Sequence, residues 1–441
     1  MKILAANREE NSSTDAIGLL SKHIQVLYPI HQYSENISNK TQYMLLYYII
    51  CVLFSIFAIM IDRISENQIR DLLKGFPCVA IIGPRQVGKT TLAKKIQKGY
   101  ESSLYIDLEF QKDFIKLEDA ETYLKQFENR LVIIDEVQRK KDLFPVLRAL
   151  IDQNRKPGRF LLLGSAAPDL LRNSSESLAG RIAYHEVTPF LLPELQDKYT
   201  IEDIWMHGGF PDAFLNQKYW VQWMNNYTKT YFERDLPNLG FPADSITGER
   251  LWTMLAHYHG NLINYAEIGR SLELNIHTIK RYIGFLKSAF LIRVIEPFHL
   301  NVKKRLVKSP KVYIRDSGVM HYLSGIENID QLQGHPKKGA SWEGFVIEQI
   351  IPLLPANRKV YFYRTHDGAE LDLVIIKGNK PVVSIEIKFG SDARPTRGNT
   401  EAIQTLKTLQ NYIIIKDEED YILSGGFRVC GLKTFLEKYI Y

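Results

Sequence analysis

The chain contains few cysteines for its length. There are three in 441 residues, Cys51, Cys78 and Cys430, and they lie far apart with no CxxC pair among them. This argues against a disulfide scaffold and against a zinc ribbon, because both need cysteines at paired spacing. The same scarcity favours a reducing compartment, and we therefore expect a cytoplasmic location.

A strong overall charge is also missing. The chain has 56 basic and 50 acidic residues, and its net charge of +6 is too small to indicate a partner. The hydrophobic content of 45% is that of a globular protein, so the chain as a whole is not a disordered tail. At about 150 residues per domain, the length predicts roughly three domains.

One long apolar run lies near the N-terminus. Residues Tyr43 to Ile61 contain 18 apolar or aromatic residues and one serine. That is close to the ~20 residues needed to cross a bilayer. Three interpretations stay open: a membrane anchor, a buried helix, and an over-long reading frame whose true start is Met60. We expect a membrane partner only if residues 43–61 are translated.

A glycine-rich loop follows a short apolar strand predicted over Cys78 to Ile82. Its pattern is Gly83-x4-Gly88-Lys89-Thr90, and a helix is predicted to begin at Lys89. Glycine lets backbone N–H groups approach phosphates, the lysine reaches the β and γ phosphates, and the threonine hydroxyl binds Mg²⁺. The residues of this P-loop that we predict to bind nucleotide are Gly83, Pro84, Arg85, Gln86, Val87, Gly88, Lys89, Thr90 and Thr91.

Two further apolar strands end in polar residues. The strand at 131–134 leads into Asp135 and Glu136, and the strand at 160–163 leads into Ser165 after one glycine. Ligands of parallel α/β sheets bind at the carboxyl ends of the strands. We therefore expect Asp135 to hold Mg²⁺ through water and Glu136 to take a proton from the attacking water. Ser165 either contacts the γ phosphate or only caps the next turn.

The NKxD motif that recognises guanine in GTPases is missing, because Asn39-Lys40-Thr41-Gln42 lacks the aspartate and precedes the loop. The predicted cofactors are therefore ATP and Mg²⁺. An arginine that neutralises charge on the γ phosphate is expected in such a site, and Arg172 and Arg181 are the two candidates after the third strand.

Residues 262–315 concentrate the positive charge. They contain eleven Lys or Arg and three acidic residues, a net charge of +8. The pattern predicts two helices, the second over 277–288 with Ile279, Ile283 and Leu286 inward, and then a basic hairpin that includes Lys311. This is the layout of a winged helix-turn-helix, which predicts DNA as a partner. The other interpretation is a packing module whose basic face pairs with an acidic neighbour.

Near the C-terminus two strands are predicted around a tight turn, with Asp372 on the first and Glu386 and Lys388 on the second. Counting across the turn places Asp372 opposite Glu386 to within one residue. These two, with Glu343 from an upstream helix, are candidate ligands of a divalent metal, and Lys388 would activate water. The D-x13-E-x-K spacing resembles the PD-(D/E)XK nuclease core, with Leu371 in place of the proline. The alternative is an ordinary hairpin with a salt-bridged surface.

Taken together, the motifs resemble those of prokaryotic AAA-type ATP-binding proteins whose C-terminal half is a domain of unknown function. The matching segments are FPCVAIIGPRQVGKTTLA, LVIIDEVQ, FLLLGS, SLAGRI, TPFLLPEL, GGFP, FERDL, WEGFVIEQI, FYRTHDGAELDLVI and IEIK. The resemblance implies an ATPase of the additional-strand catalytic glutamate type, a winged-helix linker and a restriction-endonuclease-like terminal domain. It assigns the nucleotide roles to Gly83, Gly88, Lys89, Thr90, Asp135 and Glu136.

The expected fold is therefore α/β: a P-loop NTPase with a parallel sheet, then a helical and winged-helix region, then an α/β restriction-endonuclease-like domain. The expected division is an extension at 1–59, the ATPase domain at 60–200, the winged-helix domain at 201–330 and the nuclease-like domain at 331–441. One hypothesis is a Mg²⁺-dependent ATPase that controls a DNA-binding, DNA-cleaving C-terminal half. The rival is a nucleotide switch whose C-terminal domain binds a protein partner or a second copy and cleaves nothing.

Overall fold

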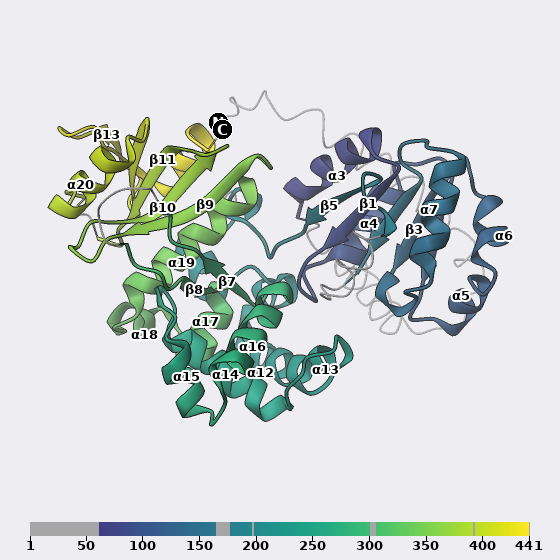
Figure 1. Ribbon diagram of the computed structural model, residues 1–441, viewed down its shortest axis with the longest axis horizontal. Helices are drawn as coiled ribbons and strands as arrows, with labels where there is room; N and C mark the ends of the chain where they lie inside the picture. Colours follow the sequence, from purple (N-terminus) through teal and green to yellow (C-terminus); the bar gives the residue numbers. More distant parts are fainter. Residues whose placement is uncertain (1–60, 165–176, 196–197, 300–305, 391–392, 441) are drawn as a thin grey trace, which may run out of the picture. The chain divides into compact units, whose positions relative to one another are not determined.

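The computed structural model describes residues 61–164, 177–195, 198–299, 306–390 and 393–440 (Figure 1). The apolar run at 43–61 lies outside these residues except for its last position, and so do Ser165, Arg172 and residues 303–305. No helix in the described ranges is long and apolar enough to cross a membrane. Asp62–Tyr441 form one compact unit.

The first sheet has five parallel strands in the order β2-β3-β4-β1-β5. Three of its strands are buried at every position, as expected for a sheet that is covered on both faces. The strands are β1 (Cys78–Ile82), β2 (Ser103–Asp107), β3 (Leu131–Asp135), β4 (Phe160–Leu163) and β5 (Ile182–Glu186). The predicted parallel sheet of a P-loop NTPase is therefore confirmed.

Helices cover both faces of this sheet (Figure 1). One face packs against α3 (Ile64–Gly75) and α4 (Lys89–Gln97). The other face packs against α5 (Gln111–Lys116), α6 (Ala120–Lys125) and α7 (Leu143–Gln153). Since neighbouring residues in a strand point to opposite faces, the apolar runs of the strands supply both cores at once.

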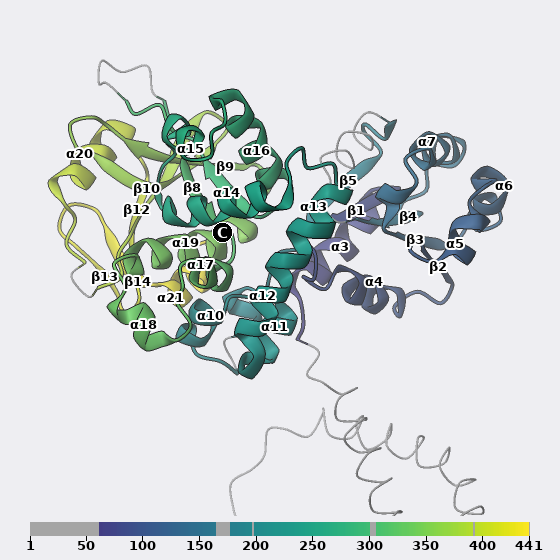
Figure 2. The ribbon, with the colours of Figure 1, turned by 90° about the horizontal axis from the view of Figure 1, so that it is seen from below.

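The next segment is mostly helical. Its helices are α9 (Leu192–Leu195), α10 (Ile201–His207), α11 (Pro211–Leu215), α12 (Trp220–Thr230), α13 (Leu236–Asn238) and α14 (Ser245–His257). The start of α10 is fixed by a capping box, in which the Thr200 and Asp203 side chains bond to each other's backbone N–H groups. A π-helical turn, η4 (Tyr231–Asp235), joins α12 to α13, and Figure 2 shows the three as one continuous rod.

The basic segment has the predicted order of elements: α15 (Tyr265–Ser271), α16 (Ile276–Ser288), β7 (Ile292–Ile295) and β8 (Lys311–Ile314), with the short β6 (Asn261–Leu262) in front. The strands form an antiparallel sheet in the order β6-β8-β7. The expected inner face of α16 is confirmed, because Ile279, Ile283 and Leu286 are all buried.

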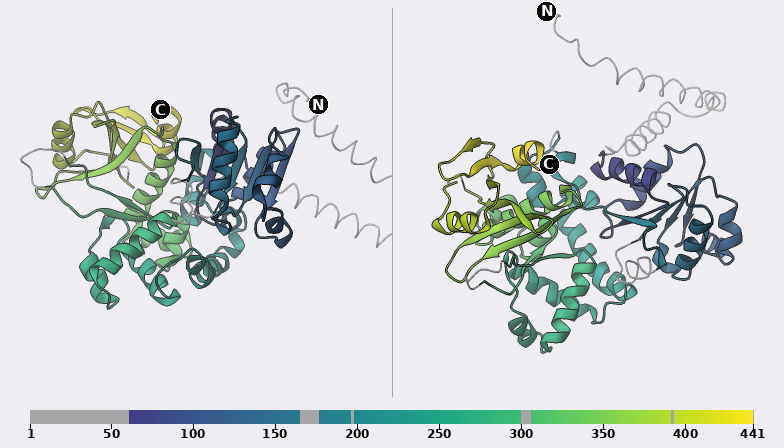
Figure 3. Two further views of the ribbon diagram at one scale, coloured as in Figure 1. Left: turned by 45° about the vertical axis from the view of Figure 1, so that its right-hand side comes forward. Right: turned by 45° about the horizontal axis from the view of Figure 1, so that its top comes forward.

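The last sheet has six strands in the order β13-β14-β12-β11-β10-β9. It belongs to the green and yellow part of the ribbon in Figure 3. The strands are β9 (Arg358–Arg364), β10 (Glu370–Lys377), β11 (Lys380–Ile387), β12 (Gln410–Ile415), β13 (Asp420–Ile422) and β14 (Arg428–Gly431). The helices of this region are α17 (Ser317–Leu323), α18 (Ile329–Gly334), α19 (Lys338–Ile350), α20 (Arg397–Leu406) and α21 (Leu432–Lys438). In the β10–β11 hairpin Leu373 pairs with Ile385, which confirms that Asp372 lies opposite Glu386.

Candidate functional site

The P-loop connects the end of β1 to the start of α4. Gly83 has φ +145, and a Cβ atom there would lie 2.2 Å from the carbonyl oxygen of Val187. Gly88 precedes α4 with φ +90, in the left-handed region. Both positions therefore require glycine, the first because the residue after β5 approaches closely and the second because of the backbone conformation.

The Lys89 side chain lies inside the loop. Its exposed fraction is 8%, and its Nζ donates to the carbonyl oxygens of Gly83 at 3.1 Å and Pro84 at 2.7 Å. Burial lowers the pKa of Lys89 to about 8, against the opposing effect of the Glu136 and Asp135 carboxylates. The ammonium thus lies in the concave side of the loop, where phosphate oxygens would replace the two carbonyls as acceptors.

Thr90 and Asp135 meet at the carboxyl edge of the sheet. The Thr90 hydroxyl donates to Asp135 Oδ2 at 2.6 Å, and the Tyr105 hydroxyl donates to the same oxygen at 2.7 Å. A nucleotide-bound Mg²⁺ takes only one or two protein ligands and completes its shell with phosphate oxygens and water. The two residues therefore fit the Mg²⁺ that the sequence predicts.

Glu136 follows directly, in a left-handed conformation with φ 53. Burial, and after it the neighbouring Asp135, raises the pKa of Glu136 above its ordinary value. Gln138 donates a hydrogen bond to its carboxylate. A carboxylate with a raised pKa beside a Mg²⁺ ligand is suited to accept a proton from water.

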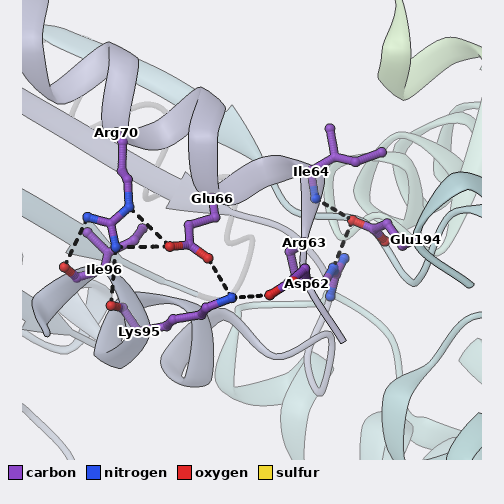
Figure 4. Close-up of polar contacts among 8 residues, drawn as sticks. All are labelled: Asp62, Arg63, Ile64, Glu66, Arg70, Lys95, Ile96 and Glu194. Atoms are coloured by element: carbon purple, nitrogen blue, oxygen red, sulfur yellow. Dashed lines mark hydrogen bonds and ion pairs between the residues drawn. The ribbon is translucent and has the colours of Figure 1, made fainter. Parts of the chain in front are cut away.

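Arg63 is a residue of this site that the sequence did not indicate. Its guanidinium donates to the carbonyl oxygens of Val87 at 3.0 Å and Thr188 at 2.6 Å, and to Glu194 Oε1 at 3.1 Å. Figure 4 shows that Glu194 also accepts from the backbone N–H of Ile64, at 2.8 Å. Arg63, just before α3, thus links the P-loop to the segment after β5 through hydrogen bonds. No spacing rule connects residues so far apart in sequence.

A second arginine ties the P-loop to the helical segment. Arg85 donates to the carboxylate of Asp235, which is 3% exposed and lies in the π-helical turn η4. Burial opposes the charge of Arg85, but Asp235 outweighs it and raises the pKa of Arg85 above its ordinary value. Arg234 also donates to Asp235, at 2.9 Å. The nucleotide loop and η4 are therefore in direct contact.

A partly buried chain of ion pairs leads from the end of β5 to the C-terminal half. Arg315 donates to Glu186, the last residue of β5, and to Glu348 Oε2 at 3.1 Å. Arg293 holds both oxygens of Glu348. Burial opposes ionisation of Glu348, yet its two arginine partners lower its pKa below the ordinary value. Glu186 is next to Val187, which touches Gly83, so this chain begins at the base of the P-loop.

The basic segment is only partly free for a ligand. Arg293, Lys311 and Arg315 are paired with carboxylates inside the protein. Lys311, which the sequence predicts to belong to the basic hairpin of a DNA-binding winged helix, is 2% exposed and therefore does not face a ligand in solvent. The basic side chains of the segment that are exposed in the described ranges are Arg270, Lys280, Arg281, Lys287 and Lys308.

Lys311 lies among the carboxylates predicted to bind metal. Its Nζ is 3.1 Å from Glu343 Oε1, Glu370 Oε1 and Asp372 Oδ1. Burial opposes its charge, but these carboxylates outweigh it and raise the pKa of Lys311 well above its ordinary value. The ammonium therefore stays charged and occupies the centre of the set.

The other two predicted residues make hydrogen bonds to partners other than Lys311. Glu386 Oε2 accepts from Asn399 Nδ2 at 2.9 Å, and the Lys388 ammonium donates to the carbonyl oxygen of Arg394 at 2.5 Å. Burial, followed by Asp372, raises the pKa of Glu386 to about 9 and that of Glu343 to about 7. Among the described residues, no group of three or more His, Cys, Asp or Glu is arranged to hold a metal ion. The carboxylates as they stand do not fit a divalent metal.

The chain is similar along most of its length to two mycobacterial proteins. It is 40% identical over 364 residues to the uncharacterized protein Rv2008c of Mycobacterium tuberculosis, and equally to the uncharacterized protein Mb2031c of Mycobacterium bovis. Each match covers 82% of this chain and 81% of the relative. The chain belongs to their family.

Models of smaller regions divide the chain further. Residues 75–196 match the AAA domain, and residues 198–330 and 338–435 match two domains of unknown function, DUF8612 and DUF4143. The P-loop segment is thus an AAA-type ATPase domain. Among solved structures, the Walker-type ATPase paby2304 of Pyrococcus abyssi is 16% identical with a TM-score of 0.40, and the match covers 60% of this chain and 96% of that one.

Proposed function

We propose that the protein binds and hydrolyses ATP with Mg²⁺. The observation that carries the proposal is the contact of Thr90 with Asp135, beside the loop-bound ammonium of Lys89. Lys89 would hold the β and γ phosphates, and Thr90 and Asp135 would hold the Mg²⁺ that neutralises phosphate charge. Glu136 accepts a proton from the water that attacks the γ phosphate. The direct test is release of phosphate from ATP by the full chain, with EDTA-treated protein as the blank.

We further propose that the nucleotide state controls the C-terminal half. Arg85 belongs to the P-loop, and its partner in this structure is Asp235. An incoming triphosphate offers Arg85 acceptors of higher charge and competes with Asp235 for it. Binding would then release η4, and the Glu186–Arg315–Glu348 chain would connect the base of the loop to α19.

Replacing Asp235 with Asn should tighten ATP binding. The change frees Arg85 from its buried counter-charge, so the guanidinium becomes available to the phosphates. We expect the Kd for ATP to fall by about threefold to tenfold, measured by titration calorimetry on nucleotide-free protein. Glu233→Gln is the matched control, because Glu233 is an exposed acid two residues earlier. An unchanged Kd in Asp235→Asn would contradict the competition.

The proposed partner of the C-terminal half is DNA, bound through residues 262–315. The support is that Lys280, Arg281 and Lys287 are all exposed on α16. In a winged-helix docking this helix enters the major groove and the basic groups contact phosphate. The second candidate is a nucleotide switch whose C-terminal domain binds protein. It is favoured by the internal pairing of Arg293, Lys311 and Arg315.

Replacing both Lys280 and Arg281 with Gln should separate these two candidates. If DNA binds, its affinity should fall for all sequences, and the slope of log K against log salt should decrease by about 1 per lost phosphate contact. Fluorescence anisotropy of a labelled duplex over a salt series measures both quantities. Lys125→Gln, on the exposed surface of the ATPase domain, is the control. Wild-type protein that binds no duplex at low salt would rule out DNA.

A further inference from the structure

The carboxylate cluster around Lys311 already holds a cation that belongs to the protein itself. An ammonium group has three N–H donors and no acceptor. Lys311 Nζ has three carboxylate oxygens at 3.1 Å, from Glu343, Glu370 and Asp372. Every donor of the ammonium therefore has an ionisable partner, and its side chain is 3% exposed.

A divalent metal could not share this position. Mg²⁺ and Ca²⁺ need their oxygen ligands at about 2.0–2.6 Å. The oxygens of Glu343 and Asp372 that face the centre of the cluster are the ones bound to Lys311. A metal on these oxygens would meet the ammonium at contact distance, where two positive charges repel each other strongly in a site shielded from water.

Two further donors from the chain contact the carboxylates of this cluster. Glu343 Oε1 accepts from the Tyr313 hydroxyl at 2.5 Å, and Asp372 Oδ2 accepts from the backbone N–H of Ile387 at 2.9 Å. Both donors come from the chain itself, on β8 and β11. Glu343 and Asp372 thus accept hydrogen bonds from other protein groups as well as from Lys311. This is typical of a structural ion-pair network and not of an open metal site.

We infer that Lys311 takes the place at which a nuclease of this layout would hold its metal, so that Asp372 and Glu386 perform no metal-dependent cleavage in this protein. The cation comes from β8, in the region matched by DUF8612, and the carboxylates come from α19 and β10, in the region matched by DUF4143. The cluster therefore joins two regions of the chain. The inference does not depend on the proposed ATPase activity.

The test is a Mn²⁺ titration of the nucleotide-free full chain, followed by the electron paramagnetic resonance signal of free Mn²⁺. The wild-type protein and the Asp372→Asn variant should bind the same amount of Mn²⁺, because Asp372 holds no metal in the wild type. Lys311→Met should create a site at least about tenfold tighter than any in the wild type. Adding Asp372→Asn to Lys311→Met should remove it. Lys308→Met is the matched control, since Lys308 is exposed and three residues away.

Two results would overturn the inference. One is a wild-type Mn²⁺ site that disappears in Asp372→Asn, and the other is a Lys311→Met variant that is folded by circular dichroism yet binds no more Mn²⁺ than the wild type. If Lys311→Met does not fold, the comparison of wild type with Asp372→Asn decides the question. Lys311→Arg then serves as a further control: it keeps the positive charge, so it should bind no Mn²⁺ at this cluster. Incubation of wild type with duplex DNA and Mn²⁺ should give no cleavage that depends on Asp372.

Discussion

Replacing Glu136 with Gln should leave ATP bound but reduce its turnover by about 10²–10⁴-fold, the usual contribution of a general base. The amide keeps the size of the side chain and can still accept from Gln138, so the loop geometry should persist. It cannot take a proton from water. Fluorescent-nucleotide binding and phosphate release, measured on one preparation, separate the two effects.

The Lys89→Ala variant should behave differently from Glu136→Gln, because it should lose ATP binding as well as turnover. Lys89 contacts phosphate in our account, so its loss should weaken ATP binding as well as turnover. Glu109→Gln, an exposed acid after β2, should change neither quantity. If Glu136→Gln and Lys89→Ala both hydrolyse ATP as fast as the wild type, the assignment of the site is wrong.

Replacing Arg315 with Met should cost about 3 kcal/mol of unfolding free energy, because it breaks a buried ion pair while leaving the acids in place. Arg315 is the only link in the described structure between Glu186 and Glu348. Glu348 keeps Arg293, and the Glu186 side chain is 33% exposed, so both acids retain partial compensation. Urea unfolding followed by tryptophan fluorescence measures the loss.

Arg181→Met is the matched control for this variant. Arg181 also pairs with a carboxylate, Asp152, but both side chains are partly exposed. A surface pair of this kind contributes much less to stability than a buried pair, because water and salt screen it. Equal losses in the two variants would mean that Arg315 acts as an ordinary surface arginine. In this structure Arg181 is paired with Asp152, and its role at the γ phosphate stays a prediction.

The parts of the fold predicted from sequence are those in which local spacing decides the structure. The positions of Gly83 and Lys89 were predicted correctly because the glycine-rich pattern lies between a short apolar strand and the start of a helix. The apolar spacing of Ile279 and Ile283 gave the inner face of α16. The turn between β10 and β11 set the register to within one residue, and a bulge between Ile375 and Ile376 makes the final one-residue shift that brings Asp372 opposite Glu386.

The parts that could not be predicted depend on side chains that meet across long stretches of chain. Lys311 lies 61 residues from Asp372, and within a run of lysines and arginines it has the composition of a surface residue. It lies on β8, the central strand of the three-stranded sheet, and all four residues of β8 are buried. Arg63 and Asp235 were missed for the same reason: each reaches the P-loop through tertiary packing, for which the sequence has no periodic signal.

The most direct test of the account is ATP turnover by the full chain, measured with and without duplex DNA over a series of salt concentrations. We predict Mg²⁺-dependent turnover that changes when DNA is added at low salt, and a difference that fades as salt weakens the phosphate contacts. Such a result would tie the P-loop to the basic segment. Turnover that is the same with and without DNA at every salt concentration would contradict control of a DNA-binding half by nucleotide.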